Sequence, residues 1–415
     1  MLLYLLFVLS VLLLSSFLIG PLTGRVWMVI VMFIYLLFTA TPNLLKKQNV
    51  YVYMSLFVIY IILMFGVMCI NGDMEAYGWK WILANHFVSI VVFLATYNIT
   101  RDNTQKRFDI IMMIIMVVLV ADSIITILQY SNNPIGWAAH IILTQGRNEE
   151  TVAFQESHNF LDSLAGMART PGIFNEVVGN AIFLGSYGVL PFYFLQKKFK
   201  IIKILAVIVM GLSLLACFAC QERAGMLTLV ASVMYLGYKN MRKKSLGLLF
   251  ALVIFFVLLI SIDFSSVDFG RFQEEGLFSN EARKDIWDSF IPFFSENWIW
   301  GGVENFRKIT GGFLPHNFFL NALVFGGFLG GIVVIVLLFL ILLRIYKNVV
   351  SKKTTKTTCI ISIALLSILA QSFVHNMSLM SGDVFTFLLL GLMASSEDST
   401  DALFIELKEK DQAII

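Results

Sequence analysis

The sequence predicts an all-α integral membrane protein, a bundle of about 12 transmembrane helices. Hydrophobic residues make up 58% of the 415 residues and charged residues only 14%, whereas a soluble domain carries about 25% charged residues. The mean hydropathy is +0.83, and apolar runs of the length that crosses a bilayer recur along the chain. A net charge of +3, without a basic stripe, gives no indication of a nucleic-acid partner.

Each apolar run of about 20 residues is expected to span the membrane once. The opening run "MLLYLLFVLSVLLLSSFLIG" lacks a basic start and is too long for the core of a signal peptide, so it predicts the first span. The run 224–238 is the shortest. The expected spans are residues 2–20, 26–42, 50–70, 81–98, 108–129, 173–195, 201–220, 224–238, 246–262, 328–346, 357–374 and 380–395.

The distribution of Lys and Arg predicts the orientation of these spans. After every second span comes a basic cluster, and these clusters with the C-terminal tail hold 20 of the 30 Lys and Arg residues. Cytoplasmic loops are enriched in basic residues. The pattern predicts that both termini are cytoplasmic and that residues 1–415 form a single integral membrane domain.

Two longer loops then fall on the outer face, at 130–172 and at 263–315, the second between spans nine and ten. The stretch "EARKDIWDSFIPFF" (281–294) in the second loop has apolar residues at helical spacing with charged residues between them. It predicts an amphipathic helix that either lies on the membrane surface or packs over the bundle.

Ten of the basic residues lie on the outer side, where the charge bias does not expect them, and four of these stand out: Arg169, Arg223, Arg271 and Arg283. Arg223 is the most unusual, because its loop is so short that the guanidinium must lie near membrane depth. Each arginine alone could pair with an acid or extend to the surface. Several on one face indicate a phosphate or pyrophosphate ligand, because guanidinium binds these anions with two hydrogen bonds.

His316 lies at the outer membrane edge, before a hydrophobic helix that Pro315 can start. The positive end of the helix dipole favours neutral imidazole there, the form that takes a proton from a hydroxyl. Amide groups of the first turn could also bind an anion. The alternative is an interfacial histidine bonded to a loop carbonyl.

Cys217 and Cys220 have the spacing of a metal or redox pair, but no second pair or nearby histidine completes a site. We therefore expect them to pack as small apolar residues. No Asp-x-Asp metal motif occurs either, and the sequence predicts neither a metal nor a cofactor.

Residues 169–345 resemble the shared domain of bacterial O-antigen ligases and O-antigen or capsule polymerases. The resemblance is carried by "ARKDIWDSF", "WGGVENF", "PHNFFLNALVFGGFLGG", "RTPGIFNEVVGN" and "QERAGMLTLV". Glu222 stands where the family usually has Ser. The matching residues are Arg169, Arg223, Arg283, Trp287, Gly301, Gly302, Phe306, His316, Asn317, Gly326, Gly327 and Gly330.

This resemblance implies glycan transfer from undecaprenyl pyrophosphate at the periplasmic face of the bacterial inner membrane, without a metal. Arg223, Arg283 and Arg169 would bind the pyrophosphate, and His316 would act on the acceptor hydroxyl. Asn317, Trp287 and Arg271 would support the site. The implied partners are a lipid-linked oligosaccharide, a glycan acceptor, the bilayer and a chain-length regulator.

Three functions remain open. A polymerase joins one lipid-linked repeat unit to another, and the altered Ser-Arg segment favours this function. A ligase transfers the finished glycan to the lipid A core. A polysaccharide transporter or flippase is the alternative of another class, because about 12 spans with both termini inside also suit transporters.

Overall fold

The computed structural model describes most of the chain. The described residues are 2–14, 17–20, 22–39, 48–73, 82–101, 105–145, 170–174, 176–240, 281–315, 317–351, 354–375 and 383–397. The chain divides into two compact units. One comprises Met1–Val11, Arg25–Ile110 and Asn280–Ile415, and the other comprises Leu12–Gly24 and Ile111–Ser279. Each is described by itself.

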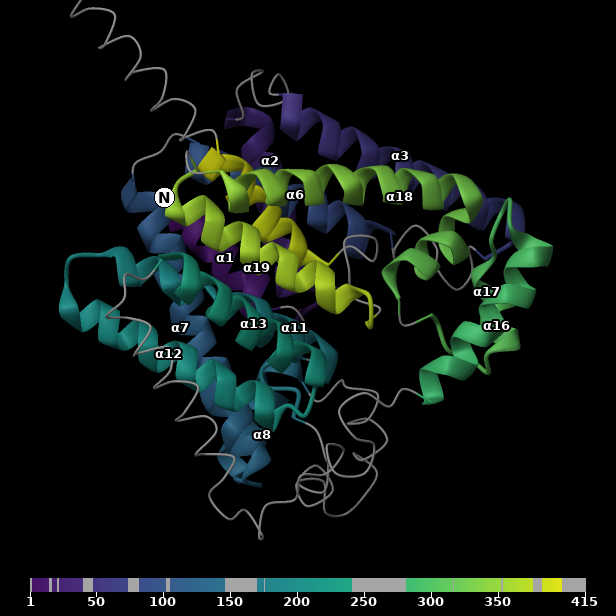
Figure 1. The fold of residues 1–415 in the computed structure, drawn as a ribbon. Helices are drawn as coiled ribbons and strands as arrows, with labels where there is room; N and C mark the ends of the chain where they lie inside the picture. Colours follow the sequence, from purple (N-terminus) through teal and green to yellow (C-terminus); the bar gives the residue numbers. More distant parts are fainter. Residues whose placement is uncertain are drawn as a thin grey trace, which may run out of the picture. The chain divides into compact units, whose positions relative to one another are not determined.

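In the described residues of the first unit, every regular element is a helix. The unit holds most of α1 (Leu2–Leu13) and α2 (Gly24–Thr39), then α3 (Gln48–Asn71), the π-helix η2 (Leu83–Phe87) and α6 (Val88–Arg101). After a long interval in sequence come α16 (Glu281–Asn297), α17 (Val303–Ile309), α18 (Phe318–Val350) and α19 (Lys356–Ser372), and a last helix covers 384–397. Figure 1 shows α3 and α18 side by side over much of their length.

In the described residues of the second unit, the regular elements are helices and one small hairpin, β1 (Leu18–Ile19) with β2 (Leu22–Thr23). Its helices are most of α7 (Gln105–Tyr130), α8 (Pro134–Thr144), α11 (Val177–Tyr187), the 3-10 helix η3 (Leu190–Gln196), α12 (Lys200–Ala219) and α13 (Arg223–Asn240). Helix α11 is buried along its length, and it packs on both α12 and α13.

Five helices in the described part of the chain are long and apolar enough to cross a membrane: Val50–Asn71, Lys106–Tyr130, Val177–Gln196, Lys200–Ala219 and Phe318–Val350. Six more apolar helices are shorter. Side chains such as Phe339 on α18 and Ile201 on α12 are apolar yet 61% and 73% exposed. Apolar surface on both sides of a helix is expected where lipid covers the side that protein does not.

The first expected span differs from the structure. Helix α1 ends at Leu13 rather than at residue 20. The chain then turns at Gly20, which has a left-handed φ of +65°, and forms the hairpin. The side chain of Gln145 pairs with that hairpin, since it accepts from the N–H of Leu18 at 3.1 Å and donates to the carbonyl of the same residue at 3.1 Å.

The tenth expected span, 328–346, is only the second part of a longer helix. Helix α18 begins at Phe318, and its helical geometry is interrupted at Gly327, where φ is +60°. Elsewhere the expected spans correspond to helices within a few residues, whereas the span 246–262 lies outside the described residues. Helix α8, within the expected loop 130–172, was not predicted.

Close packing of α3 against α18 depends on two glycines. A Cβ at Gly326 would lie 3.3 Å from Cε2 of Tyr60, and one at Gly330 would lie 3.5 Å from the same atom. Tyr60 is buried there. Small residues on one helix let a partner helix approach closely, which is the main source of helix association within a bilayer.

Candidate active site

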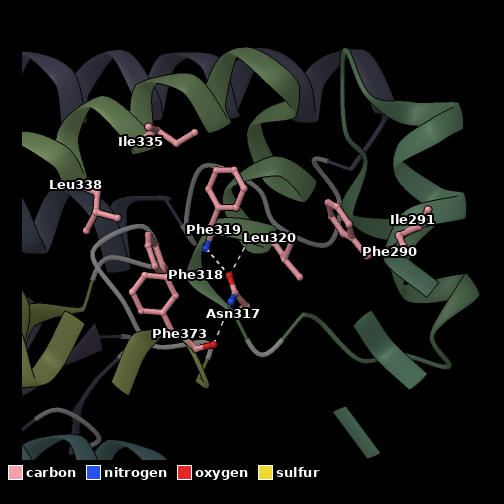
Figure 2. Close-up of a pocket in the computed structure, with 9 residues that line it drawn as sticks. All are labelled: Phe290, Ile291, Asn317, Phe318, Phe319, Leu320, Ile335, Leu338 and Phe373. Carbon is pink, nitrogen blue, oxygen red and sulfur yellow. Dashed lines mark hydrogen bonds between the residues drawn. The ribbon is translucent and has the colours of Figure 1, made fainter. Parts of the chain in front are cut away.

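Asn317 starts α18 as its N-cap residue (Figure 2). Its Oδ1 accepts hydrogen bonds from the N–H groups of Phe319 at 2.9 Å and Leu320 at 3.1 Å. Its Nδ2 donates to the carbonyl of Phe373, just after α19, at 3.1 Å. The side-chain amide of Asn317 therefore caps the start of α18 and also bonds the residue that follows α19. These bonds hold the start of α18 against the end of α19.

This cap corrects two expectations. The helix starts at Phe318, after Asn317, and not at Pro315, because the asparagine side chain supplies the acceptors that the first turn needs. The backbone N–H groups of Phe319 and Leu320 already donate to Asn317, so these two groups are not available to bind an anion. His316 lies outside the described residues, and its place in the sequence is directly before the cap.

A pocket of about 500 Å³ opens beside Asn317. Figure 2 shows residues of α16, of both parts of α18 and of the end of α19 around it. The lining side chains are Phe290, Ile291, Asn317, Phe318, Phe319, Leu320, Ile335, Leu338 and Phe373. Asn317 is the only polar residue among them, so the pocket suits a hydrocarbon group that ends close to a polar one.

Helix α16 contributes one wall of this pocket and confirms the helix expected at 281–294. Phe290 and Phe293 face inward and meet Phe306 of α17, with ring centroids 6.3 and 5.1 Å apart. Ile291 is 72% exposed. Arg283 and Trp287 lie in the same helix, two turns and one turn before Phe290 respectively, and their side chains lie outside what the structure describes.

The loop between α16 and α17 closes the break in α18. The N–H of Phe328 donates to the carbonyl of Trp298 at 2.9 Å, and the N–H of Gly302 donates to that of Val324 at 2.9 Å. A Cβ at Gly327 would lie 2.0 Å from the carbonyl oxygen of Ile299, and one at Gly301 would lie 2.4 Å from that of Val324. Here the glycines are required because two backbones touch.

The same loop is fixed to the end of α3. Oδ2 of Asp73 accepts a hydrogen bond from the N–H of Val303, the first residue of α17, at 2.8 Å. Nδ2 of Asn71 donates to the carbonyl of Trp300 at 3.3 Å. Asp73 is buried, and this burial raises its carboxyl pKa, while the bond from Val303 opposes the rise. Thus α17 is capped from a residue 230 positions away.

Helices α16 and α17, their glycine loop and the start of α18 form one continuous stretch of sequence. Residues 205–335 match the family model described as O-Antigen ligase. The match covers 131 residues, about a third of the chain, and confirms the resemblance inferred from the sequence. No curated protein matches the chain.

The O-antigen ligase region, as we now call residues 205–335, contains six of the seven predicted site residues. They are Arg223, Arg271, Arg283, Trp287, His316 and Asn317. Arg169 precedes it. Among the described residues, no group of three or more His, Cys, Asp and Glu side chains could hold a metal ion.

Arg223 belongs to the second unit, in the O-antigen ligase region, and begins α13. A short turn through Gln221, whose φ is +55°, separates it from the end of α12. Two residues later, a Cβ at Gly225 would lie 2.7 Å from the carbonyl of Ala181, so α13 approaches α11 closely. Arginine at a helix start opposes the helix dipole, and a bound anion would relieve that repulsion.

Of the seven predicted site residues, the structure describes the side chains of Arg223 and Asn317. Arg169, Arg271 and His316 lie outside the described residues, and only the backbone of Arg283 and Trp287 is described. Arg223 and Asn317 are described, and they lie in different units. The sequence analysis did not single out Gln129 of α7 or His140 of α8, whose buried side chains both donate to the carbonyl of Gly172. Polar residues in an apolar run were the available signal.

Proposed function

We propose that this protein transfers a glycan from undecaprenyl pyrophosphate to the hydroxyl of a second lipid-linked repeat unit, and so acts as an O-antigen or capsule polymerase. The match of residues 205–335 to the O-antigen ligase family carries the proposal, because it covers Arg223, Arg283 and His316. The reaction takes place on the periplasmic side of the bacterial inner membrane.

The arginines act on the leaving group in this proposal. Arg223 and Arg283 bind the pyrophosphate, with help from Arg169, and neutralise the charge that develops as the bond between the sugar and the phosphate breaks. The positive charge at the start of α13 supports this role for Arg223. No metal is needed where guanidinium groups supply the charge. Arg271 and Trp287 support the same part of the site.

His316 takes the proton from the acceptor hydroxyl, whose oxygen then attacks the anomeric carbon. Asn317 holds the start of α18, and with it the position of the preceding residue. The pocket beside Asn317 offers an apolar surface next to this polar point, which suits a lipid-linked substrate with a hydrocarbon chain on one side and sugars on the other. A chain-length regulator would act on the product.

The first experiment compares the lipid-linked glycans of cells with and without this protein. A pool of single repeat units supports the polymerase. Long chains together with bare lipid A core would favour the ligase instead. An unchanged pool would contradict glycan transfer and return the transporter to consideration.

A second experiment tests the residues in proteoliposomes that contain a purified lipid-linked donor. We expect His316→Ala and Arg283→Ala to lower the transfer rate by at least about a hundredfold, with unchanged amounts of protein in the membrane. Arg307→Ala is the matched control. This arginine of α17 is 3.7 Å from Glu304 in an exposed ion pair, and its loss should leave the rate unchanged.

A further inference from the structure

Four lysines lie close together in sequence where η3 is joined to α12 in the second unit. They are Lys197, Lys198, Lys200 and Lys203, and we call them the lysine cluster. Lys198 and Lys200 are exposed, and Lys203 is half-buried. Nζ of Lys197 donates to Oη of Tyr193 at 2.9 Å and lies 4.5 Å from the centre of its ring. Helix η3 therefore holds one of the four side chains in place.

The lysine cluster has no counter-charge on the helices around it. No Asp or Glu occurs between Glu176 and Glu222, a stretch that contains α11, η3 and α12. Helix α13, which also packs on α12, contains no acidic residue either. Within the part of the chain that the structure describes, no ion pair is formed by Lys198, Lys200 or Lys203.

The concentration of positive charge at this point opposes folding. Lys200 and Lys203 lie one turn apart at the start of α12, where like charges repel each other and positive charge also opposes the helix dipole. The N-cap residue of α12 is Phe199, whose side chain accepts no hydrogen bond. An anion from outside the chain would therefore relieve a repulsion that the surrounding helices leave uncompensated.

An apolar stripe begins at the same end of α12. Its exposed members lie on one face at helical spacing, and they are Ile201, Ile204, Leu205 and Ile208. Lys200 is a neighbour of both Lys203 and Ile204 on the helix surface, because residues three and four apart lie side by side. Phe199, directly before the helix, is 72% exposed. The lysines thus lie at one end of a surface that suits hydrocarbon.

The length of α12 matches this end to the level of the lipid headgroups. The helix has 20 residues and is about 30 Å long, the thickness of the hydrocarbon core. When its apolar residues cross that core, Lys200 at the first position lies at the boundary with water. A soluble anion would match the lysines alone. An anionic phospholipid matches the lysines with its phosphate and the stripe with its acyl chains.

We propose that the lysine cluster and the apolar stripe of α12 form a binding site for an anionic phospholipid such as phosphatidylglycerol. The ammonium groups of Lys198, Lys200 and Lys203 bind the headgroup phosphate, and the acyl chains lie along α12. In the predicted orientation this lipid belongs to the cytoplasmic leaflet. The proposal does not depend on the proposed function, and its site lies at the opposite end of α12 from the turn that leads to Arg223.

The test titrates the purified full-length protein in detergent with phosphatidylglycerol or with phosphatidylcholine of the same acyl chains, and counts bound lipid by native mass spectrometry. In Lys200→Gln/Lys203→Gln we expect the apparent Kd for phosphatidylglycerol to rise about ten- to thirtyfold, because each basic residue near a lipid phosphate contributes about fivefold. The Kd for phosphatidylcholine should not change. Lys200→Arg/Lys203→Arg, which keeps both charges, should bind as the parent does.

The matched control is Lys347→Gln/Lys356→Gln. It removes two exposed lysines of the first unit, in the last turn of α18 and at the start of α19, and changes the net charge by the same amount. An equal loss of phosphatidylglycerol binding in this variant would mean that binding follows total charge, and it would overturn the site. A parent protein that binds both lipids equally would overturn it as well.

Thermal unfolding separates a lipid from a free anion. Phosphatidylglycerol should raise the apparent Tm of the parent protein more than phosphatidylcholine does, because a ligand of the folded state stabilises it. Lys200→Gln/Lys203→Gln should lose this difference and keep the parent's Tm in phosphatidylcholine, since neither side chain is buried. Inorganic phosphate at the same concentration should have no effect. If phosphate alone raises the Tm as much, the lysine cluster binds free anions and the lipid site is refuted.

Discussion

The backbone N–H of Phe328 donates a hydrogen bond to the carbonyl of Trp298 at 2.9 Å. A helix interrupted within a membrane protein leaves backbone groups that need partners, because lipid offers none. Here the loop between α16 and α17 supplies them at the point where Gly327 interrupts α18. The loop therefore stabilises the break in α18 through specific backbone hydrogen bonds.

Gly327→Ala should destabilise the protein strongly. The new Cβ would lie 2.0 Å from the carbonyl oxygen of Ile299, and an alanine at a φ of +60° adds about 1–2 kcal/mol of backbone strain. We expect an apparent Tm lower by several degrees in detergent and a smaller folded yield. Gly66→Ala in α3 is the control, since its Cβ would meet nothing within 4 Å. Equal Tm values for the two variants would contradict the tight backbone contact.

The buried carboxyl of Asp73 should make stability depend on pH. Burial raises its pKa in the folded protein, so between the ordinary value of about 4 and the raised value the folded state holds more protons than the unfolded state. Stability is then lost as pH rises through that window. Asp73→Asn should remove this fall of the apparent Tm as pH rises above about 4.

Asparagine at this position still offers an oxygen to the N–H of Val303, whereas Asp73→Ala leaves that buried amide without its acceptor. The alanine variant should therefore lose about 1–3 kcal/mol at every pH. If Asp73→Asn shows the same pH slope as the parent protein, another group is responsible for that slope.

Trp298 and Trp300 should contact lipid. They are 47% and 48% exposed, with Ile299 between them at 43%, and they lie where residues 328–350 of α18 begin. That part of the helix is about 35 Å long, enough to cross the hydrocarbon core alone, and tryptophan favours the boundary between lipid and water. Brominated lipids should quench their fluorescence in proteoliposomes.

The tryptophan contribution is isolated by comparing the parent with Trp298→Phe and Trp300→Phe, because the chain has seven tryptophans. Trp137→Phe is the control, since Trp137 is 1% exposed in the second unit. If quenching falls equally in all three variants, the loop does not lie in the lipid boundary.

Asn317→Asp should keep the helix cap that Oδ1 provides and remove the hydrogen bond that Nδ2 donates to Phe373. Aspartate caps a helix as well as asparagine does, so the start of α18 should remain folded. It cannot donate to the carbonyl of Phe373, and it brings a negative charge near the proposed site. We expect a transfer rate lower by about tenfold or more with little change in Tm.

Asn317→Ala should instead lower stability by about 1 kcal/mol through loss of the cap. The comparison of Tm and transfer rate between the two variants checks both effects. A fully active Asn317→Asp would place the reaction away from this end of α18.

Hydropathy predicted most of the helices, because a spanning helix must be apolar over its whole length and little else competes with that signal. It could not predict the break at Gly327, which arises from contact with a loop that lies some 25 residues earlier in the chain. The same holds for the end of α1 at Leu13. There the apolar run continues, but the side chain of Gln145 stabilises a hairpin instead.

The sequence predicted candidate site residues where a charge lay in an unusual place. It could not predict roles that depend on hydrogen bonds between distant parts of the chain. Arg223 was noticeable from a short loop alone, and it does begin a helix there. Asn317 was expected as a supporting residue, yet its role as a cap follows from bonds to three backbone groups that sequence spacing does not specify. Gln129 and His140 act on a glycine that is distant in sequence, so no local pattern could connect them.

The interruption of α18 also makes the length of the membrane crossing independent of the direction of the segment that begins at Phe318. In a straight helix the two would be coupled. The part after Gly327 is long enough to match the thickness of the bilayer, and the part from Phe318 to Gly326 is joined to it through a single glycine. Substitutions that adapt the crossing to a thicker or thinner membrane therefore need not alter the tilt of the segment that begins at Asn317. Under the proposed function, adaptation to the lipid and adaptation to the substrate would then act on opposite sides of that glycine.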